Sequence, residues 1–142
     1  MISLDHVHPM LVHFPIALVI FGFIAELSLL IFKKGTWLSK TGYYLLLTGT
    51  LLSIFALLSG ELFTATLSGA AGEVKERHEL LAWITVVLLI ITSVFRIILN
   101  AGRQEKEYLR ILAFIMYGLA AFSVSLTGFY GGILVYSYMM PL

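Results

Sequence analysis

The chain alternates between four long apolar stretches and short polar connections. The apolar stretches run from Pro9 to Phe32, from Tyr43 to Gly60, from Leu80 to Leu99 and from Leu109 to Gly131. About 20 mainly apolar residues are enough for a helix to cross the hydrocarbon core of a bilayer. The pattern therefore predicts an all-α fold, a bundle of four transmembrane helices.

The composition agrees with this prediction. Hydrophobic residues make up 60% of the 142 residues and charged residues only 12%, with a mean hydropathy of +0.99. A soluble domain is about half apolar and a quarter charged. We therefore expect residues 1–142 to form a single integral membrane domain. The first apolar stretch is too long for a cleavable signal, and no basic patch is large enough to bind nucleic acid.

The positions of the basic residues predict the orientation. One side of the predicted bundle carries Lys33, Lys34, Lys40, Arg96, Arg103, Lys106 and Arg110. The other side carries only Lys75 and Arg77, among several glutamates. Because cytoplasmic connections are enriched in Lys and Arg, we expect both termini outside. In a bacterium this places the protein in the inner membrane, with both termini on the periplasmic side.

The two halves of the chain resemble each other. Each half has a histidine near the start of its first apolar stretch, His13 in one and His78 in the other. Each half closes on similar residues, Leu58-Ser59-Gly60 and Leu126-Thr127-Gly128. Either a helical hairpin is duplicated in parallel, with both histidines at one depth, or apolar sequence merely looks repetitive.

Small residues share one face of the second and fourth predicted helices, at spacings of three and four. They are Gly49, Ser53, Ala56 and Gly60 on the second, and Gly118, Ala121, Ser125 and Gly128 on the fourth. Such faces let helix backbones approach closely. They also have room for a flat macrocycle such as haem, so the four glycines are candidate cofactor-binding residues.

The histidines are the main candidates for chemistry. If the first and third helices run parallel, His13 and His78 face each other as the two axial ligands of a low-spin haem b. His8 lies nearby and is a candidate third ligand. Alternatively, His8, His13 and His78 bind a zinc, copper or iron ion together with a carboxylate such as Glu76 or Glu73. The structural alternative is that each imidazole only hydrogen-bonds a carbonyl or water.

Other features narrow the choice of function. The chain has no cysteine, which excludes disulfides, zinc–thiolate sites, iron–sulfur clusters and cysteine-attached haem. It has no hydrolase motif and no phosphate-binding loop, so an enzymatic activity is neither indicated nor excluded. Glu26 and Arg96 lie within apolar stretches, and pairing with each other reduces the cost of both charges.

The segment from His8 to Leu18, His-Pro-Met-Leu-Val-His-Phe-Pro-Ile-Ala-Leu, closely resembles the opening of a bacterial membrane family called domain of unknown function 2231. The segment Gly131–Tyr136 resembles its closing motif, and His78 matches a histidine at the start of its third helix. The resemblance implies a four-helix membrane protein. Some relatives are joined to Rieske or c-type cytochrome modules, which implies by association a place in electron transfer.

Three functional hypotheses follow. The first is a small b-type cytochrome-like protein that holds haem near the periplasmic side and passes electrons between a membrane partner or quinone and a periplasmic carrier. The second is a metal-binding membrane protein that uses the histidines. The third is a non-catalytic accessory subunit, or a homo-oligomer, that packs through its glycine-lined faces.

Overall fold

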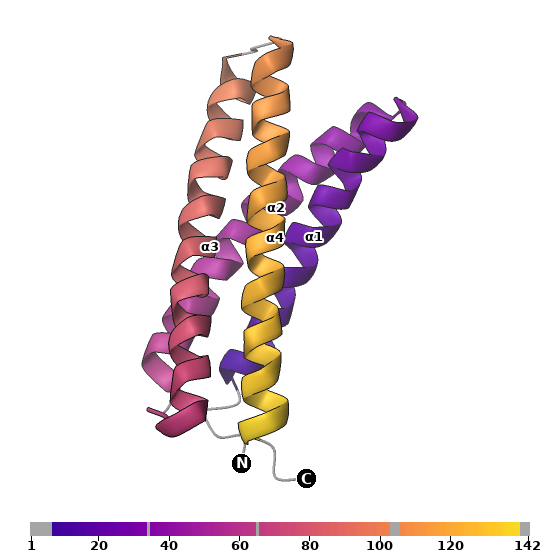
Figure 1. Cartoon of the computed structure of the whole chain (residues 1–142). Helices are drawn as coiled ribbons and strands as arrows, with labels where there is room; N and C mark the ends of the chain where they lie inside the picture. The colour runs from indigo at the N-terminus through magenta and orange to yellow at the C-terminus, as the bar shows by residue number, and fades with distance from the viewer. Residues whose placement is uncertain (1–6, 34, 65, 103–105, 140–142) are drawn as a thin grey trace.

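A computed structural model describes residues 7–33, 35–64, 66–102 and 106–139 of the chain. These residues form the helices α1 (Val7–Phe32), α2 (Thr36–Phe63), α3 (Gly69–Ala101) and α4 (Glu107–Ile133), followed by a short π-helix, η2 (Leu134–Met139). All four α-helices are long and apolar enough to cross a membrane, which confirms the predicted fold class. Figure 1 shows the bundle that they form.

The helices begin earlier than the apolar stretches alone suggest. α3 starts at Gly69, well before Leu80, because the intervening segment contains two Ala, three Glu, one Lys and one Arg, residues that favour helix. The short turn between α1 and α2 has a left-handed backbone at Lys33 (φ 51°) and at Gly35 (φ 87°). Glycine adopts that conformation without the steric penalty of a side chain, so Gly35 permits the sharp reversal.

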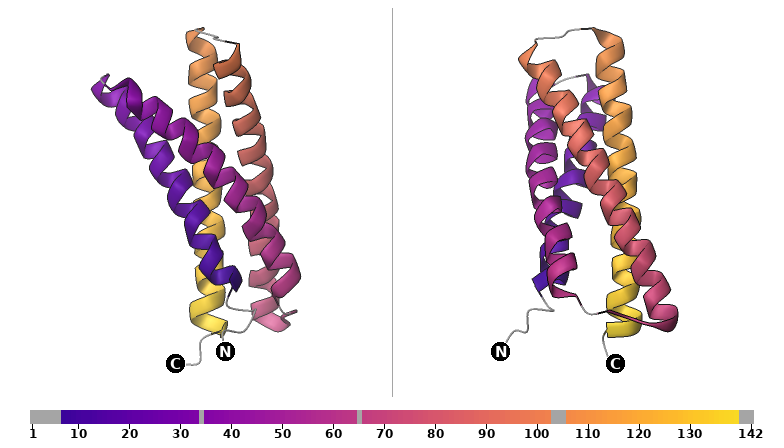
Figure 2. Two further views of the ribbon diagram at one scale, coloured as in Figure 1. Left: turned by 180° about the vertical axis from the view of Figure 1, so that it is seen from behind. Right: turned by 90° about the vertical axis from the view of Figure 1, so that its left-hand side faces the viewer.

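The bundle consists of two helical hairpins, α1–α2 and α3–α4. The hairpins lie close together at the end where α1 begins and α4 finishes, and they diverge towards the end that carries the α1–α2 turn (Figures 1 and 2). We call the first of these the cavity end, for the cavity described below.

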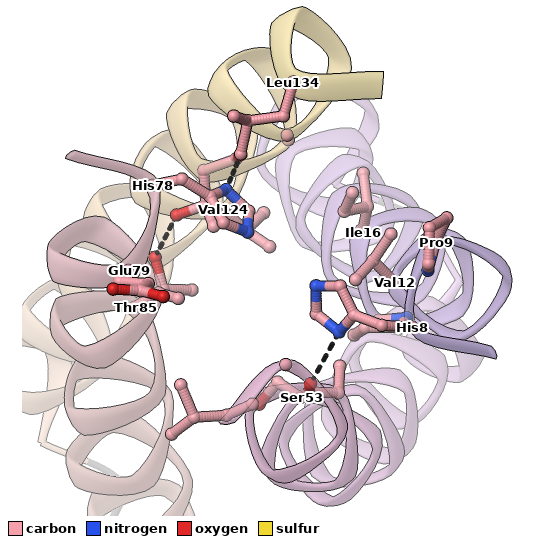
Figure 3. Close-up of a pocket in the computed structure, with 18 of the residues that line it drawn as sticks. His8, Pro9, Val12, Ile16, Ser53, His78, Glu79, Thr85, Val124 and Leu134 are labelled. Atoms are coloured by element: carbon pink, nitrogen blue, oxygen red, sulfur yellow. Dashed lines mark hydrogen bonds between the residues drawn. The ribbon is translucent and has the colours of Figure 1, made fainter. Parts of the chain in front are cut away.

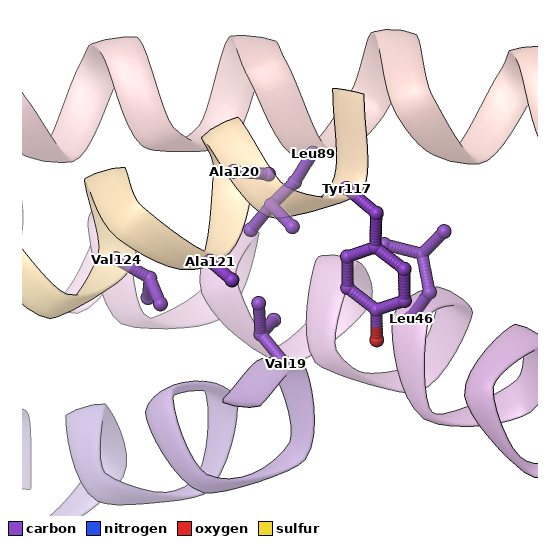
Figure 4. Close-up of a cluster of buried hydrophobic side chains, with 7 residues drawn as sticks. All are labelled: Val19, Leu46, Leu89, Tyr117, Ala120, Ala121 and Val124. Carbon is purple, nitrogen blue, oxygen red and sulfur yellow. The ribbon is translucent and has the colours of Figure 1, made fainter. Parts of the chain in front are cut away.

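The two hairpins repeat one pattern of burial. Val19 on α1 and Leu89 on α3 are 70 positions apart, and both have no exposed surface. Leu46 on α2 and Tyr117 on α4 are 71 positions apart and are equally buried. These residues form the hydrophobic core together with Ala120, Ala121 and Val124 (Figure 4).

A repeat of this kind places a two-fold axis along the bundle. Residues that lie on such an axis contact their own equivalents. Two contacts between the hairpins meet this condition: Glu26 pairs with Arg96, and the ring of His8 lies against that of His78. Each pair is 70 positions apart. These contacts agree with a parallel repeat of one hairpin, which is one of the two sequence interpretations.

Two of the small residues serve packing between helices. A Cβ on Gly49 would lie 2.8 Å from Val19 Cγ2, and a Cβ on Gly118 would lie 3.3 Å from the ring of Phe23. Hydroxyl groups add hydrogen bonds between helices, one between Thr50 and Ser93 (2.8 Å) and one between Thr85 and Ser123 (2.7 Å). Close packing and such bonds are what hold helices together in lipid.

The ion pair between Glu26 and Arg96 confirms the expected pairing of these two side chains. Arg96 donates from Nη2 to Glu26 Oε1, and Glu26 is 7% exposed. Gly42 leaves space for the carboxylate, because a Cβ there would lie 2.6 Å from Glu26 Cγ. The hydroxyl of Tyr117 donates to the Gly42 carbonyl at 3.4 Å, beside the pair.

We expect Glu26→Leu to lower the free energy of unfolding by about 3–5 kcal/mol, because it leaves the Arg96 charge buried without a partner. The double variant Glu26→Leu/Arg96→Leu removes both charges and should recover most of the loss. Denaturant unfolding in detergent micelles measures both effects. Purely additive losses in the single and double variants would contradict the pairing.

Candidate functional site

A cavity of about 210 Å³ lies at the cavity end and is bordered by all four helices and η2. Figure 3 looks into it and shows side chains from each hairpin directed inwards. Most of its lining is apolar. The side chains with nitrogen or carboxylate groups that border it are His8, His13, Glu61, Lys75, His78 and Glu79.

Two imidazoles face each other across this cavity. The ring centres of His8 and His78 are 6.2 Å apart, with their planes at 76°. The rings project towards each other from α1 and α3 (Figure 3). The structure thus places His8, and not the expected His13, opposite His78. His13 comes five residues after His8, which places it roughly 140° further round the helix.

Backbone carbonyls determine which nitrogen of each ring carries the proton. His8 Nδ1 lies 3.0 Å from the Ala56 carbonyl oxygen and 2.9 Å from Ser59 Oγ. His78 Nδ1 lies 3.0 Å from the Thr127 carbonyl oxygen. Because a carbonyl only accepts, each Nδ1 must donate. Each neutral ring then keeps its lone pair on Nε2, which is the arrangement typical of metal-ligating histidines.

The two Nε2 atoms are reachable from the cavity. Neither has a hydrogen-bond partner among the described residues, and no fully buried side-chain nitrogen or oxygen there lacks one. The free lone pairs of His8 and His78 therefore border accessible space. Figure 3 shows the second ring nitrogen of each imidazole on the cavity side.

Each imidazole lies on a glycine of the neighbouring helix in its own hairpin. A Cβ on Gly60 would lie 3.0 Å from His8 Cε1, and a Cβ on Gly131 would lie 3.1 Å from His78 Cε1. Gly131 is thus the equivalent of Gly60 in the repeat, in place of the expected Gly128. Gly128 also borders the cavity, but it packs against Ile16 Cδ1, which a Cβ would approach to 3.0 Å.

The proposed metal-ligand set is not assembled. Among the residues that the structure describes, no group of three or more His, Cys, Asp or Glu side chains is placed to hold an ion. His13 is exposed, and its Nδ1 donates to the Pro9 carbonyl of its own helix at 2.7 Å. Glu76 is exposed and does not line the cavity. The structure therefore does not bring His8, His13, His78 and Glu76 together as one set.

Sequence reasoning missed the charged residues at the rim of the cavity. Glu61 accepts a hydrogen bond from Trp83 Nε1 at 3.3 Å, which links α2 to α3. Lys75 pairs with Glu79 at 2.9 Å along α3. A signal for the imidazole pair was present in the sequence, because His8 and His78 have the same separation as Glu26 and Arg96.

Substitutions at the adjacent glycines separate the ring contact from general effects of a larger side chain. We expect Gly131→Val to lower the free energy of unfolding by about 1–3 kcal/mol, because its methyl groups overlap the His78 ring. Gly132→Val is the matched control, since a Cβ there has nothing within 4 Å. Thermal unfolding in detergent compares the two. Equal losses would show that His78 does not rest on Gly131.

Comparison with known proteins gives one match. No curated protein and no solved structure matches the chain. A family described as "Predicted membrane protein (DUF2231)" matches over residues 5–141, which span all four helices and both imidazoles of the facing pair. The chain therefore belongs to the membrane-protein family called domain of unknown function 2231.

Proposed function

We propose that the chain is a small b-type cytochrome-like membrane protein in which His8 and His78 are the axial ligands of a haem iron. The observation that carries this proposal is the 6.2 Å separation of the two ring centres. Metal–imidazole bonds are about 2.0–2.1 Å long. Two such bonds, plus the reach from each ring centre to its Nε2, account for about this separation when one ion lies between the nitrogens.

The number of ligands favours haem over a free ion. Zinc sites take three or four protein ligands, whereas haem iron already has four nitrogens from the macrocycle and needs only its axial ligands. The described residues bring together two imidazoles and no third ligand. The apolar lining also suits a macrocycle, since cofactor sites are mostly apolar with a few polar groups that fix orientation.

The chain's own residues would hold and orient the group. Haem supplies one-electron redox chemistry when bound. Ala56 and Thr127 fix the planes of the two imidazoles through their carbonyls, and the four helices limit access of water. The cavity of about 210 Å³ is below the ~300–1,000 Å³ usual for small-molecule sites. Haem binding therefore requires the side chains and helices around the imidazole pair to make room for the macrocycle while the two rings keep their separation.

One observation favours a second candidate, a transition-metal ion. A cavity of about 210 Å³ holds an ion and several waters, each of which occupies about 30 Å³ in the liquid, without movement of the hairpins. The ion would have His8 and His78 as its protein ligands and complete its coordination with water or another small ligand. Copper, zinc and iron all bind imidazole well.

We infer that the cavity end faces the periplasm, in the inner membrane of a bacterium. The described basic residues at the opposite end are Lys33, Lys40, Arg96, Lys106 and Arg110. Lys75 and Arg77 lie near the cavity end beside acidic residues. This distribution agrees with the enrichment of Lys and Arg in cytoplasmic connections. A redox partner would then be another membrane component or a periplasmic carrier.

Absorption spectra of the purified protein test the haem proposal. After expression with ample haem, we expect a Soret band with the features of a six-coordinate, low-spin haem. His8→Ala and His78→Ala should each abolish that low-spin spectrum, because each removes one axial ligand. His13→Ala is the control and should retain it.

Two other results of the same measurement would overturn the haem proposal. Stoichiometric copper, zinc or iron without a Soret band, lost in the His8 and His78 variants, would establish the metal-ion candidate instead. A protein without haem or metal would leave the accessory-subunit hypothesis.

Single cysteines test the orientation, because the natural chain has none. In intact spheroplasts, a membrane-impermeant maleimide should label Ser68→Cys in the α2–α3 connection and should not label Ala101→Cys at the opposite end. Both positions are exposed, so both should react after the membrane is permeabilised. The reverse pattern would place the cavity end in the cytoplasm.

A further inference from the structure

The two-fold repeat makes two gaps of the bundle equivalent, one between α2 and α3 and one between α1 and α4. At the cavity end, the first gap is bridged by the hydrogen bond from Trp83 Nε1 to Glu61 Oε1. The ion pair of Lys75 with Glu79 lies at the same rim. One hydrogen bond therefore spans this side of the cavity, and an ion pair within α3 lies beside it.

Among the residues that the structure describes, no equivalent hydrogen bond joins α1 to α4. The position 70 residues before Trp83 is His13, and the position 71 residues after Glu61 is Gly132. Gly132 has no side chain, and a Cβ there would have nothing within 4 Å. His13 bonds its own helix through Nδ1. Both residues border the cavity, and a Cβ on Gly132 would meet open space. We call this side of the cavity, beyond the contact of Ile16 with Gly128, the entrance.

The chemistry of the entrance differs from that of the bridged gap. The residues on α1 and η2 that line the cavity beside His13 and Gly132 include Pro9, Val12, Val135 and Tyr136, none of which carries a charge. The entrance lies within the apolar spans of α1 and α4, so a molecule that passes through it comes from the bilayer. Because His13 Nδ1 donates to a carbonyl, its neutral ring presents Nε2 as an acceptor.

We propose that the entrance binds the ring of a lipid-soluble quinol, with a ring hydroxyl donating a hydrogen bond to His13 Nε2. In the haem-free protein a single ring fits the cavity, since a cavity of about 150 Å³ in another protein accommodates benzene and this one measures about 210 Å³. A role of such a ligand in electron transfer rests on the proposed haem function. The binding site itself does not, because it requires no bound iron.

The fluorescence of Trp83 provides a local measurement of binding. The chain contains two tryptophans, Trp37 and Trp83, and Trp83 is the one at the cavity end. Trp37→Phe therefore leaves a single reporter. The probe is heptyl-hydroxyquinoline N-oxide, a redox-inert quinol analogue that carries a ring hydroxyl and absorbs where tryptophan emits. Titration of haem-free protein in detergent should give saturable quenching.

Two substitutions in the Trp37→Phe background test the entrance. Gly132→Leu fills the open space and should abolish saturable quenching. Its control is Ser137→Leu, an exposed position outside the cavity lining, which should bind the probe like the parent. His13→Leu removes the acceptor and should weaken binding about tenfold, the loss expected for one well-placed hydrogen bond. His13→Gln keeps an acceptor and should restore most of the affinity.

Thermal unfolding of each variant shows whether it is folded. The proposal is overturned if quenching never saturates, which would mean that the probe only partitions into detergent, or if Gly132→Leu binds the probe as tightly as Ser137→Leu. Equal affinities of His13→Leu and His13→Gln for the probe would show that binding does not depend on a hydrogen bond to His13. Saturable binding in a protein that never forms a Soret band would support quinol binding at the entrance and refute the haem proposal. The failure of one proposal can therefore be distinguished from the failure of the other.

Discussion

The contacts on the two-fold axis hold this bundle together. In lipid, burial of apolar side chains provides little force between helices, because the hydrocarbon tails are as apolar as the side chains. The hairpins must therefore be joined by close packing and by polar contacts. Glu26 and Arg96 provide an ion pair towards the diverging end, the core around Val19 and Leu89 packs the middle, and two imidazoles meet at the cavity end.

The two residue pairs on the two-fold axis, Glu26 with Arg96 and His8 with His78, differ in whether their members are still identical. In a perfectly repeated chain, a residue on the axis would face a copy of itself. A glutamate facing a glutamate would place two like charges together in a low-dielectric interior, and the present chain has Arg96 opposite Glu26 instead. At the other end the two residues are still identical. Two neutral imidazoles tolerate this arrangement, because each Nδ1 donates to a carbonyl of its own hairpin.

The sequence carried enough information for the spans and for the ion pair. Four apolar stretches of sufficient length determine four helices in a membrane. Two opposite charges inside those stretches are expected to pair, because pairing reduces the cost of placing each charge in the membrane. The repeat was also visible, but its register was not. His13 was aligned with His78 and Gly60 with Gly128, because apolar sequence matches itself almost equally well at several offsets.

Apart from the shared 70-residue separation of His8 from His78 and of Glu26 from Arg96, the imidazole pair depends on where α1 begins and how it is rotated. The apolar stretch starts at Pro9, which left His8 outside the expected span, whereas α1 begins at Val7. A helix carries one face towards its neighbours, so a shift from His13 to His8 changes which side chain enters the bundle. The roles of Gly131 and Thr127 follow only from contacts between helices, which no local pattern encodes.

The facing imidazoles belong to different hairpins, and this has a thermodynamic consequence. A ligand held by both His8 and His78 is a cross-link between two halves that are otherwise joined through the α2–α3 connection and weak interhelical forces. Its binding free energy becomes part of the stability of the whole bundle, about 2.7 kcal/mol at a hundred times its dissociation constant. The abundance of the folded protein in a cell would then follow the supply of that ligand.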